Sequence, residues 1–304
     1  MKRSVCPVLV RRVFYALKAC TNKDEREDAM GKKSKLLAAA LVFAAAVFSL
    51  ACLAGCNAGD QEESPSGTGT LRVGVRDDIM NFSYLNEQTG KHYGLEIDIA
   101  NEIAKRLGYA DVEFVSVTPD SRKDTLLNGE ADCVIACYSI ADSRLENFDF
   151  SPAYYTDRAI IMVENSSLIT DVEQLKGKTV GIMSGSNTNP IFATKMYELG
   201  VIGPDVVENT DDYTQYQGIL VKKIATYEEL SKVLETGEVD AAAMDNSIAS
   251  TYMNEDRSIL DVNLGDQEYG VATQKDSELS GQVASIIQGM LDDGTIAAYI
   301  DKWN

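Results

Sequence analysis

Apolar positions recur with two different spacings along the chain after residue 70. Residues 71–75 and 112–117 carry apolar side chains at strand-like spacing, which predicts β-strands. Residues 99–107 repeat apolar side chains at helical spacing, and Gly108 is a typical residue for ending such a helix. A shorter helix is expected at 122–127, before Gly129. This alternation of strands and helices predicts an α/β fold.

A second series of elements follows in the C-terminal half. Residues 179–183 form an apolar strand-like run, and Thr226 with Glu229 has the spacing of a capping box that opens a helix. Residues 283–291 give a strongly amphipathic helical pattern, closed by Gly294. About 230 residues of this kind correspond to one or two domains.

The two series share a weak internal echo. Residues 129–132 and 237–240 both read Gly-Glu-x-Asp, and both run into an apolar segment that predicts a buried strand. Eight residues after each glycine, the predicted strands end at Cys137 and at Asp245. Two lobes built alike would place both ends at a cleft, where open α/β sheets bind small ligands. The alternative is a chance likeness between two helix–turn–strand units.

The first 69 residues differ from the rest. Residues 36–54 carry no charge and follow a lysine cluster, which is typical of an export signal. Leu53-Ala54-Gly55-Cys56 resembles a lipobox, so we expect residues 1–55 to be leader and signal peptide, with Cys56 lipidated. Residues 56–69 are polar and Gly/Ser-rich, as in a flexible tether. An uncleaved transmembrane anchor is the alternative, and Met1 and Met30 both remain possible starts.

Composition narrows the possible functions. Lys and Arg total 28 against 47 Asp and Glu, a formal charge of −19, which argues against a nucleic-acid-binding protein. One His and six Cys provide little material for catalytic triads or zinc sites, so we expect no metal and no cofactor. Cys133 and Cys137 are too far apart on an extended strand, about 13 Å, to bridge to each other. Two buried free thiols are expected.

Five blocks in order resemble the family 3 solute-binding proteins, the amino-acid receptors of ABC importers. They cover about residues 70–304, and they lie at residues 93–108, 127–132, 138–155, 175–181 and 237–245. The resemblance implies a two-lobe periplasmic-binding-protein fold of type II, with two strand crossovers that form a hinge. Lobe 1 would contain residues 70–157 with 269–304, and lobe 2 residues 158–268. The crossings would fall near 154–158 and 269–273.

The resemblance also assigns ligand-binding roles. Arg144 matches the family's carboxylate-binding arginine, Ser139 the hydroxyl beside it, and Asp245 the carboxylate that takes the ammonium. A planar guanidinium suits a bidentate carboxylate grip. Without the block match, Arg144 would be interpreted as a solvated arginine and Asp245 as a helix cap.

Four further positions complete the expected site. Phe82 matches an aromatic residue that packs on the ligand, with plain core packing as the alternative, and Cys137 would offer its carbonyl to the ammonium. Ser186 and Asn187 lie in a loop after a strand, where backbone N–H groups at a helix N-terminus favour an anion. Asn187 departs from the residue types that the family usually has there.

The ligand itself is the least constrained inference. Arg76 follows the first strand directly, and the resemblance to acidic-amino-acid binders predicts that it meets a side-chain carboxylate. Glutamate or aspartate is therefore favoured. If Arg76 instead pairs with Asp77 or Asp78, the neutral pocket would favour glutamine.

The predicted function is thus that of an extracytoplasmic, lipid-anchored and monomeric receptor. It would deliver a polar amino acid to an ABC permease and its ATPase. Two alternatives share the fold: an enzyme of the dehydratase or lytic transglycosylase type, and a ligand-sensing receptor component. An enzyme would require an additional acid or base in the cleft. A sensor usually has a membrane span and a signalling module after the domain, whereas this sequence stops at Asn304.

Overall fold

The computed structural model describes residues 68–304. The predicted signal segment, the lipidation residue Cys56 and most of the predicted tether lie outside the described residues. Within residues 68–304, no helix is both long enough and apolar enough to span a bilayer.

The first lobe is built on a five-stranded sheet with strand order β5-β1-β6-β16-β7. β1 lies parallel to both β5 and β6, while β16 runs antiparallel to β6 and β7. The strand bounds are β1 Thr70–Val75, β5 Asp111–Ser116, β6 Cys133–Val134, β7 Phe148–Phe150 and β16 Ala272–Gln274. A separate three-stranded sheet contains β2 Asp78–Ile79, β3 Ser83–Asn86 and β4 Lys91–Tyr93.

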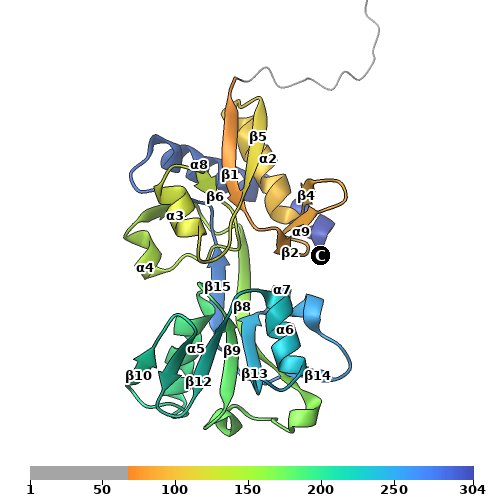
Figure 1. Cartoon of the computed structure of the whole chain (residues 1–304). Coiled ribbons are helices and arrows are strands. Elements are labelled where there is room, and N and C mark those ends of the chain that lie inside the picture. The colour runs from red at the N-terminus through yellow and green to blue at the C-terminus, as the bar shows by residue number, and fades with distance from the viewer. Residues whose placement is uncertain (1–67) are drawn as a thin grey trace, which may run out of the picture. The chain divides into compact units, whose positions relative to one another are not determined.

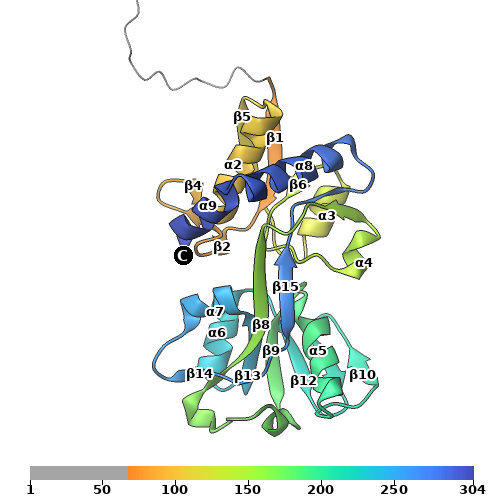
Figure 2. The same ribbon diagram turned by 180° about the vertical axis from the view of Figure 1, so that it is seen from behind.

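Helices cover this sheet. α2 (Leu95–Leu107), α8 (Glu278–Asp292) and α9 (Thr295–Trp303) contact one another, as Figure 2 shows for the rear of the lobe. α3 (Arg122–Leu127) contacts β1, β6 and β16, and α4 (Asp142–Leu145) precedes β7. The apolar face of α2 packs on the parallel strands because its spacing places those side chains on one side.

The second lobe is built on an eight-stranded sheet whose strands, β8 to β15, lie between residues 155 and 269. Its order is β10-β11-β12-β9-β13-β8-β14, and β15 also pairs with β8. The bounds are β8 Tyr155–Glu164, β9 Thr179–Met183, β10 Val206–Asn209, β11 Tyr213–Tyr216, β12 Leu220–Ile224, β13 Ala241–Asp245, β14 Arg257–Ile259 and β15 Gly265–Tyr269. The helices are the 3-10 turns Asn165–Ser167 and Val172–Leu175, then α5 Thr188–Glu198, α6 Tyr227–Glu235 and α7 Asn246–Tyr252.

Strand β13 shows how the sheet is buried on both faces. Ala242 and Met244 belong to the cluster that includes α6, and Ala241 and Ala243 belong to the cluster that includes α5. Successive side chains of a strand point to opposite faces, so small residues on both sides let both helices approach. Buried parallel strands of this kind end at the edge where α/β proteins bind ligands.

The chain passes between the lobes on β8 and β15, which pair antiparallel (Figure 1). Tyr155 lies opposite Tyr269 and Asp157 lies opposite Gln267. The first predicted crossing, near 154–158, overlaps the start of β8, whereas the second, near 269–273, overlaps this ribbon only at Tyr269 and continues into β16 of the first lobe. The exact lobe boundaries at 157/158 and 268/269 stay predictions.

Most local predictions are confirmed. α3 and β9 occupy the predicted residues, and the Oγ1 of Thr226 accepts a hydrogen bond of 3.0 Å from the N–H of Glu229. Gly108 and Gly294 adopt left-handed φ values of 79° and 81°. The predicted strand end at Cys137 is wrong, because β6 stops at Val134. Cys137 itself has a φ of 45°, which a strand cannot contain.

Candidate ligand-binding site

Strand ends and their loops bring the predicted site residues together from both lobes. Arg76 follows β1, and residues 137–139 follow β6. From the second lobe, Ser186 follows β9 and Asp245 ends β13. Charge interactions connect Cys137 with Arg76 and with Asp245, and Arg144 with Asp245, so these residues of the two lobes lie near one another. Of the eight predicted ligand-binding residues, Arg144 alone lines the cavity beside the lobe contact between Arg122 and Gly185.

Asp245 is the most constrained of them. Its side chain is buried, and its carboxylate accepts hydrogen bonds from Tyr269 Oη, from Gln267 Nε2 at 2.9 Å and from Thr188 Oγ1 at 3.4 Å. Burial raises the pKa of Asp245 to about 6, against the opposing effect of the Tyr269 hydrogen bond. Asp245 stands at the N-cap position of α7, but within the described residues its side chain makes no capping hydrogen bond to that helix. The helix-cap alternative is therefore wrong for its side chain.

Arg144 lies beside Ser139, as expected. Its Nη1 donates to the carbonyl oxygen of Ser139 at 2.6 Å, and its guanidinium carbon lies 4.5 Å from the centre of the Tyr138 ring. Burial, followed by the charge of Arg122, lowers the pKa of Arg144 to about 9. The contact uses the Ser139 backbone, whereas the expectation concerned the Ser139 hydroxyl toward a ligand.

Arg122 is a site residue that the sequence reasoning missed. Its side chain is buried, Nη1 donates to Ala136 O at 2.9 Å, and Nη2 reaches Gly185 O of the other lobe at 3.3 Å. Its Nε is buried and has no hydrogen-bond partner among residues 68–304, and its guanidinium carbon lies 4.1 Å from the Tyr138 ring centre. Burial lowers the pKa of Arg122, and the charge of Arg76 acts in the same direction.

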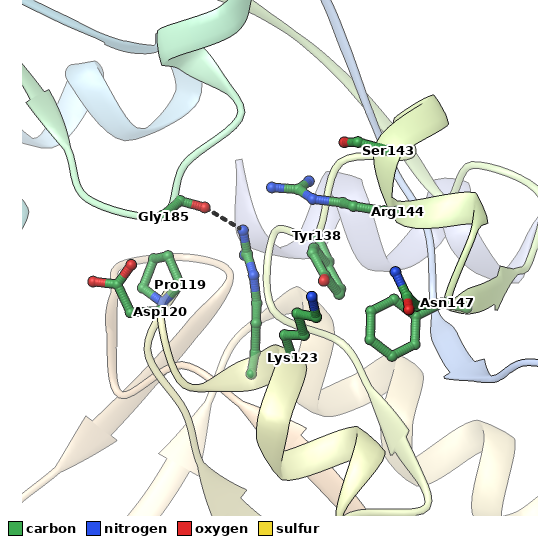
Figure 3. A pocket seen from close by; sticks show the side chains of 10 residues that line it. Pro119, Asp120, Lys123, Tyr138, Ser143, Arg144, Asn147 and Gly185 are labelled. Atoms are coloured by element: carbon green, nitrogen blue, oxygen red, sulfur yellow. Dashed lines mark hydrogen bonds between the residues drawn. The ribbon is translucent and has the colours of Figure 1, made fainter. Parts of the chain in front are cut away.

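A cavity of about 340 Å³ opens beside these two arginines. Figure 3 shows Arg144 and Tyr138 on its wall, with the Gly185 carbonyl at the end of the dashed hydrogen bond. The volume is in the range of small-ligand pockets. Residues of both lobes line it: Pro119, Asp120, Arg122, Lys123, Tyr138, Ser143, Arg144, Asn147, Phe148 and Gly185.

Arg76 has a carboxylate partner of its own. Its Nε and Nη2 donate to the two oxygens of Asp78 at 2.9 and 2.7 Å, and its side chain is only 4% exposed. The ring of Tyr227 from α6 lies 5.9 Å from its guanidinium carbon. The arrangement that would leave a neutral pocket, Arg76 paired with Asp78, is thus the one present here.

Phe82 packs against an aromatic cluster on the hinge ribbon, the antiparallel pair of β8 and β15. Its ring meets Tyr155 edge-on at 4.9 Å and Tyr269 at 6.1 Å, and those two tyrosines stack at 6.0 Å. Phe82 is 5% exposed. Its packing fits plain core as well as a wall that faces a ligand.

Cys137 is held by a buried carboxylate. Its N–H donates to Glu96 Oε1 at 2.6 Å, and Tyr154 Oη donates to the same oxygen at 2.5 Å. Burial raises the pKa of Glu96, whose second carboxylate oxygen has no hydrogen-bond partner in the described part of the chain. Cys133 and Cys137 are both free and buried, as expected, and burial raises the pKa of Cys133 to about 12.

The loop before α5 supplies the remaining two residues. Ser186 Oγ is buried and has no hydrogen-bond partner within the described residues. Asn187 occupies the N-cap position of α5, but its Nδ2 donates to Gln267 Oε1 at 3.0 Å rather than capping the helix. A buried free hydroxyl at a helix N-terminus is suited to an anionic ligand group.

Asp157 and Tyr269 were also missed. Both lie on the hinge ribbon, and both contact the neighbourhood of Asp245. In the structure, exposed and buried positions alternate along residues 156–159 and 266–269, and this alternation places Asp157 and Tyr269 on the inward face. Within residues 68–304, no group of three His, Cys, Asp or Glu side chains is arranged to hold a metal ion.

Known proteins place this site in a wider context. A glutamine-binding protein of Geobacillus stearothermophilus is 29% identical over 257 residues, covering 77% of this chain and 90% of that protein. The L-cystine-binding protein TcyJ of Escherichia coli K12 is 30% identical over 241 residues, covering 77% and 82%. A solved ancestral arginine-binding protein bound to arginine is 32% identical with a TM-score of 0.64, covering 77% of this chain and 98% of that one.

These relatives are solute-binding proteins and not enzymes, so the enzyme alternative is set aside. The two-lobe fold of the solved relative agrees with the architecture described above. The sequence profile of the bacterial extracellular solute-binding proteins, family 3, matches residues 71–304. The chain belongs to this family of solute-binding proteins.

Proposed function

We propose that the protein binds an acidic amino acid, glutamate or aspartate, between its lobes and delivers it to an ABC permease and its ATPase. The observation that carries the proposal is the pair of buried or half-buried arginines, Arg122 and Arg144. Neither forms an ion pair with a carboxylate of the described residues. Buried charges in proteins are normally paired, so both guanidiniums are ready for anionic groups of a ligand.

An acidic amino acid supplies the matching charges. Asp245 would take the ammonium, Arg144 with Ser139 the α-carboxylate, and Arg122 the side-chain carboxylate. Ser186 Oγ, buried without a partner in the described part of the chain, would donate to one of the two carboxylates. A neutral amino acid would leave one of these arginines without an anion, and a cationic one would add a charge of the same sign.

Glutamine is the second candidate, and one observation favours it. Arg76 is already neutralised by Asp78, so the basic residue first expected to read the side chain is not free. One of the relatives is itself a glutamine-binding protein. Glutamate and glutamine differ by one side-chain charge. The affinity for glutamate relative to that for glutamine therefore tests whether Arg122 binds a side-chain carboxylate.

Competition calorimetry on the purified protein with glutamate, aspartate, glutamine and arginine decides between them. We expect an acidic amino acid to bind at least tenfold more tightly than glutamine, because a desolvated guanidinium pairs best with a carboxylate. Glutamine binding more tightly than both acids would overturn the acidic proposal. Failure of every amino acid to bind would overturn the receptor proposal as a whole.

The membrane anchor is a further part of the proposal. Cys56 after Leu53-Ala54-Gly55 would be lipidated and become the mature N-terminus, holding a monomer at the outer surface of the cytoplasmic membrane. Mass spectrometry of the protein extracted from membranes should show a diacylated Cys56. An intact chain that begins upstream of Leu36 would contradict the anchor and leave the ligand proposal untouched.

A further inference from the structure

The two hinge strands present different residues to the cleft and to solvent. Asp157 pairs across from Gln267, and Tyr155 pairs across from Tyr269. Cross-strand partners share one face of a ribbon, so these four side chains lie on the same side. Asp157, Gln267 and Tyr269 are buried, while the alternate residues between them are exposed.

This inward face meets Asp245. Tyr269 Oη donates to Asp245 Oδ2, and the same hydroxyl lies 3.5 Å from Asp157 Oδ2. Gln267 Nε2 donates to the other oxygen of Asp245 at 2.9 Å. A single phenol therefore stands between two carboxylates, one at the end of β13 and one on the hinge.

The second carboxylate is held by the start of α7. Asp157 accepts from the N–H of Ser247 at 3.0 Å and also from the Ser247 hydroxyl. Ser247 is in the first turn of α7, so Asp157 takes over the capping role that Asp245 leaves vacant. The oxygens of Asp245 instead accept from Gln267 and Tyr269 of the hinge ribbon and from Thr188 at the start of α5.

Other titratable groups also face Asp245. Cys137 from the first lobe and Tyr227 from α6 both have a pKa raised by burial, so both are neutral near pH 7. Arg144 is the cation that senses this carboxylate, because the negative charge of Asp245 raises the pKa of Arg144 against the larger opposing effect of burial. No basic side chain within the described residues forms an ion pair with Asp245 itself.

We infer that Tyr269 is a positioning residue that keeps the Asp245 carboxylate charged and oriented for a ligand ammonium, against the opposing charge of Asp157. The inference rests on the proposed function, because it takes Asp245 as the ammonium site. It adds that the hinge itself sets the pH below which the protein releases an amino acid.

The direction of each effect follows from the contacts. Burial raises the pKa of Asp245 to about 6, the Tyr269 hydrogen bond lowers it, and the charge of Asp157 raises it. An ammonium binds the ionised carboxylate, so affinity is complete above that pKa and falls as the pH drops through it. Removing the Tyr269 hydroxyl must move this fall to higher pH, and removing the Asp157 charge must move it to lower pH.

Titration calorimetry with L-glutamate between pH 5 and 8 tests the inference in wild type, Tyr269→Phe and Asp157→Asn. The ligand's own side chain titrates near pH 4.3, below this range. The amide introduced by Asp157→Asn keeps an oxygen that accepts from Ser247, so the α7 cap is retained in that variant. We expect the midpoint to rise by about half to one pH unit in Tyr269→Phe and to fall by a similar amount in Asp157→Asn.

Proton release adds a readout that a merely structural role would not change. Repeating the titrations in buffers of different ionisation enthalpy counts the protons released per ligand, and the wild type should release more protons as the pH falls through about 6, the pKa of the free Asp245 carboxyl. Midpoints that move in the same direction, or do not move, would overturn the inference while leaving the receptor proposal standing. Absence of glutamate binding at every pH would instead remove the proposed function, and the inference with it.

Discussion

At the level of single residues, the most unusual feature of the candidate site is that two guanidiniums lie over one aromatic ring, that of Tyr138. Arg122 and Arg144 lie 4.1 and 4.5 Å from the centre of the Tyr138 ring, so the ring stabilises two like charges that would otherwise repel. Neither has a carboxylate partner in residues 68–304. Such an arrangement is costly without an anion, and a dicarboxylate would relieve it.

Replacing Arg122 therefore tests the side-chain specificity. Arg122→Gln should weaken glutamate binding at least tenfold and glutamine binding much less, because only glutamate loses a charged partner. Lys123→Gln is the matched control, since Lys123 lines the same cavity and is exposed. Equal losses for both ligands would mean that Arg122 supports the fold of the cleft rather than the choice of ligand.

The ligand-binding roles of Arg144 and Asp245 came from family blocks and stay predictions. Arg144 lines the cavity, and Asp245 is buried against Tyr269 of β15. Arg122 gave no comparable signal, because charged residues are mostly exposed and nothing in the pattern of a six-residue helix marks one as buried. Arg76 shows the converse: its place after β1 was predictable, but its bidentate pair with Asp78 two residues later depends on side-chain geometry.

Glu96 links one element to another. It stands in the first turn of α2, yet its carboxylate holds the N–H of Cys137 and the hydroxyl of Tyr154 from outside the helix. Elements with regular periodicity, such as β9 and α3, were predictable residue for residue. The bend after Val134 was not, because a carboxylate 41 residues away stabilises it.

The pH dependence of stability should reveal this buried carboxylate. Burial raises the pKa of Glu96 above its value in the unfolded chain, so the folded protein holds the proton more tightly between the two values. The free energy of unfolding of the wild type should therefore fall, relative to Glu96→Gln, as the pH rises through that window. Urea titrations at about pH 5 to 8 measure the difference, and a constant difference would contradict it.

A truncated side chain gives the corresponding structural control. Glu96→Ala leaves the Cys137 and Tyr154 donors without an acceptor and should cost about 2–4 kcal/mol, whereas Glu96→Gln keeps an acceptor oxygen and should cost less. Equal losses in the two variants would show that shape rather than hydrogen bonding matters there.

At the scale of the whole molecule, the contact that joins the two lobes beside the cavity is the one between Gly185 and the first lobe. Gly185 of the second lobe has a φ of 66° and lies against the loop that carries Pro119 and Asp120 of the first. Its carbonyl accepts from Arg122 Nη2, so the residue that we propose to bind the ligand's side chain also makes the contact between the lobes. The echo between residues 129–132 and 237–240 predicted two similar halves, but this contact between them could not be predicted because no local pattern records it.

Gly185→Ala should therefore impair binding through closure. An added Cβ would lie 2.5 Å from Asp120 Oδ1 and 2.7 Å from the Pro119 carbonyl carbon, and backbone atoms cannot yield as a flexible side chain does. The lobes must then separate by enough to admit a methyl group, which removes the Arg122 contact and opens the cleft to water. We expect at least a tenfold loss of glutamate affinity and a smaller ligand-induced compaction in small-angle X-ray scattering.

Gly200→Ala is the matched control: Gly200 has a φ of 72° and no described atom, apart from its chain neighbours, within 4 Å of its added Cβ, so that variant bears the same backbone strain without the steric contact. Both variants should lose similar stability, and only Gly185→Ala should lose affinity; equal affinities would show that the lobes need not meet at this residue to hold the ligand.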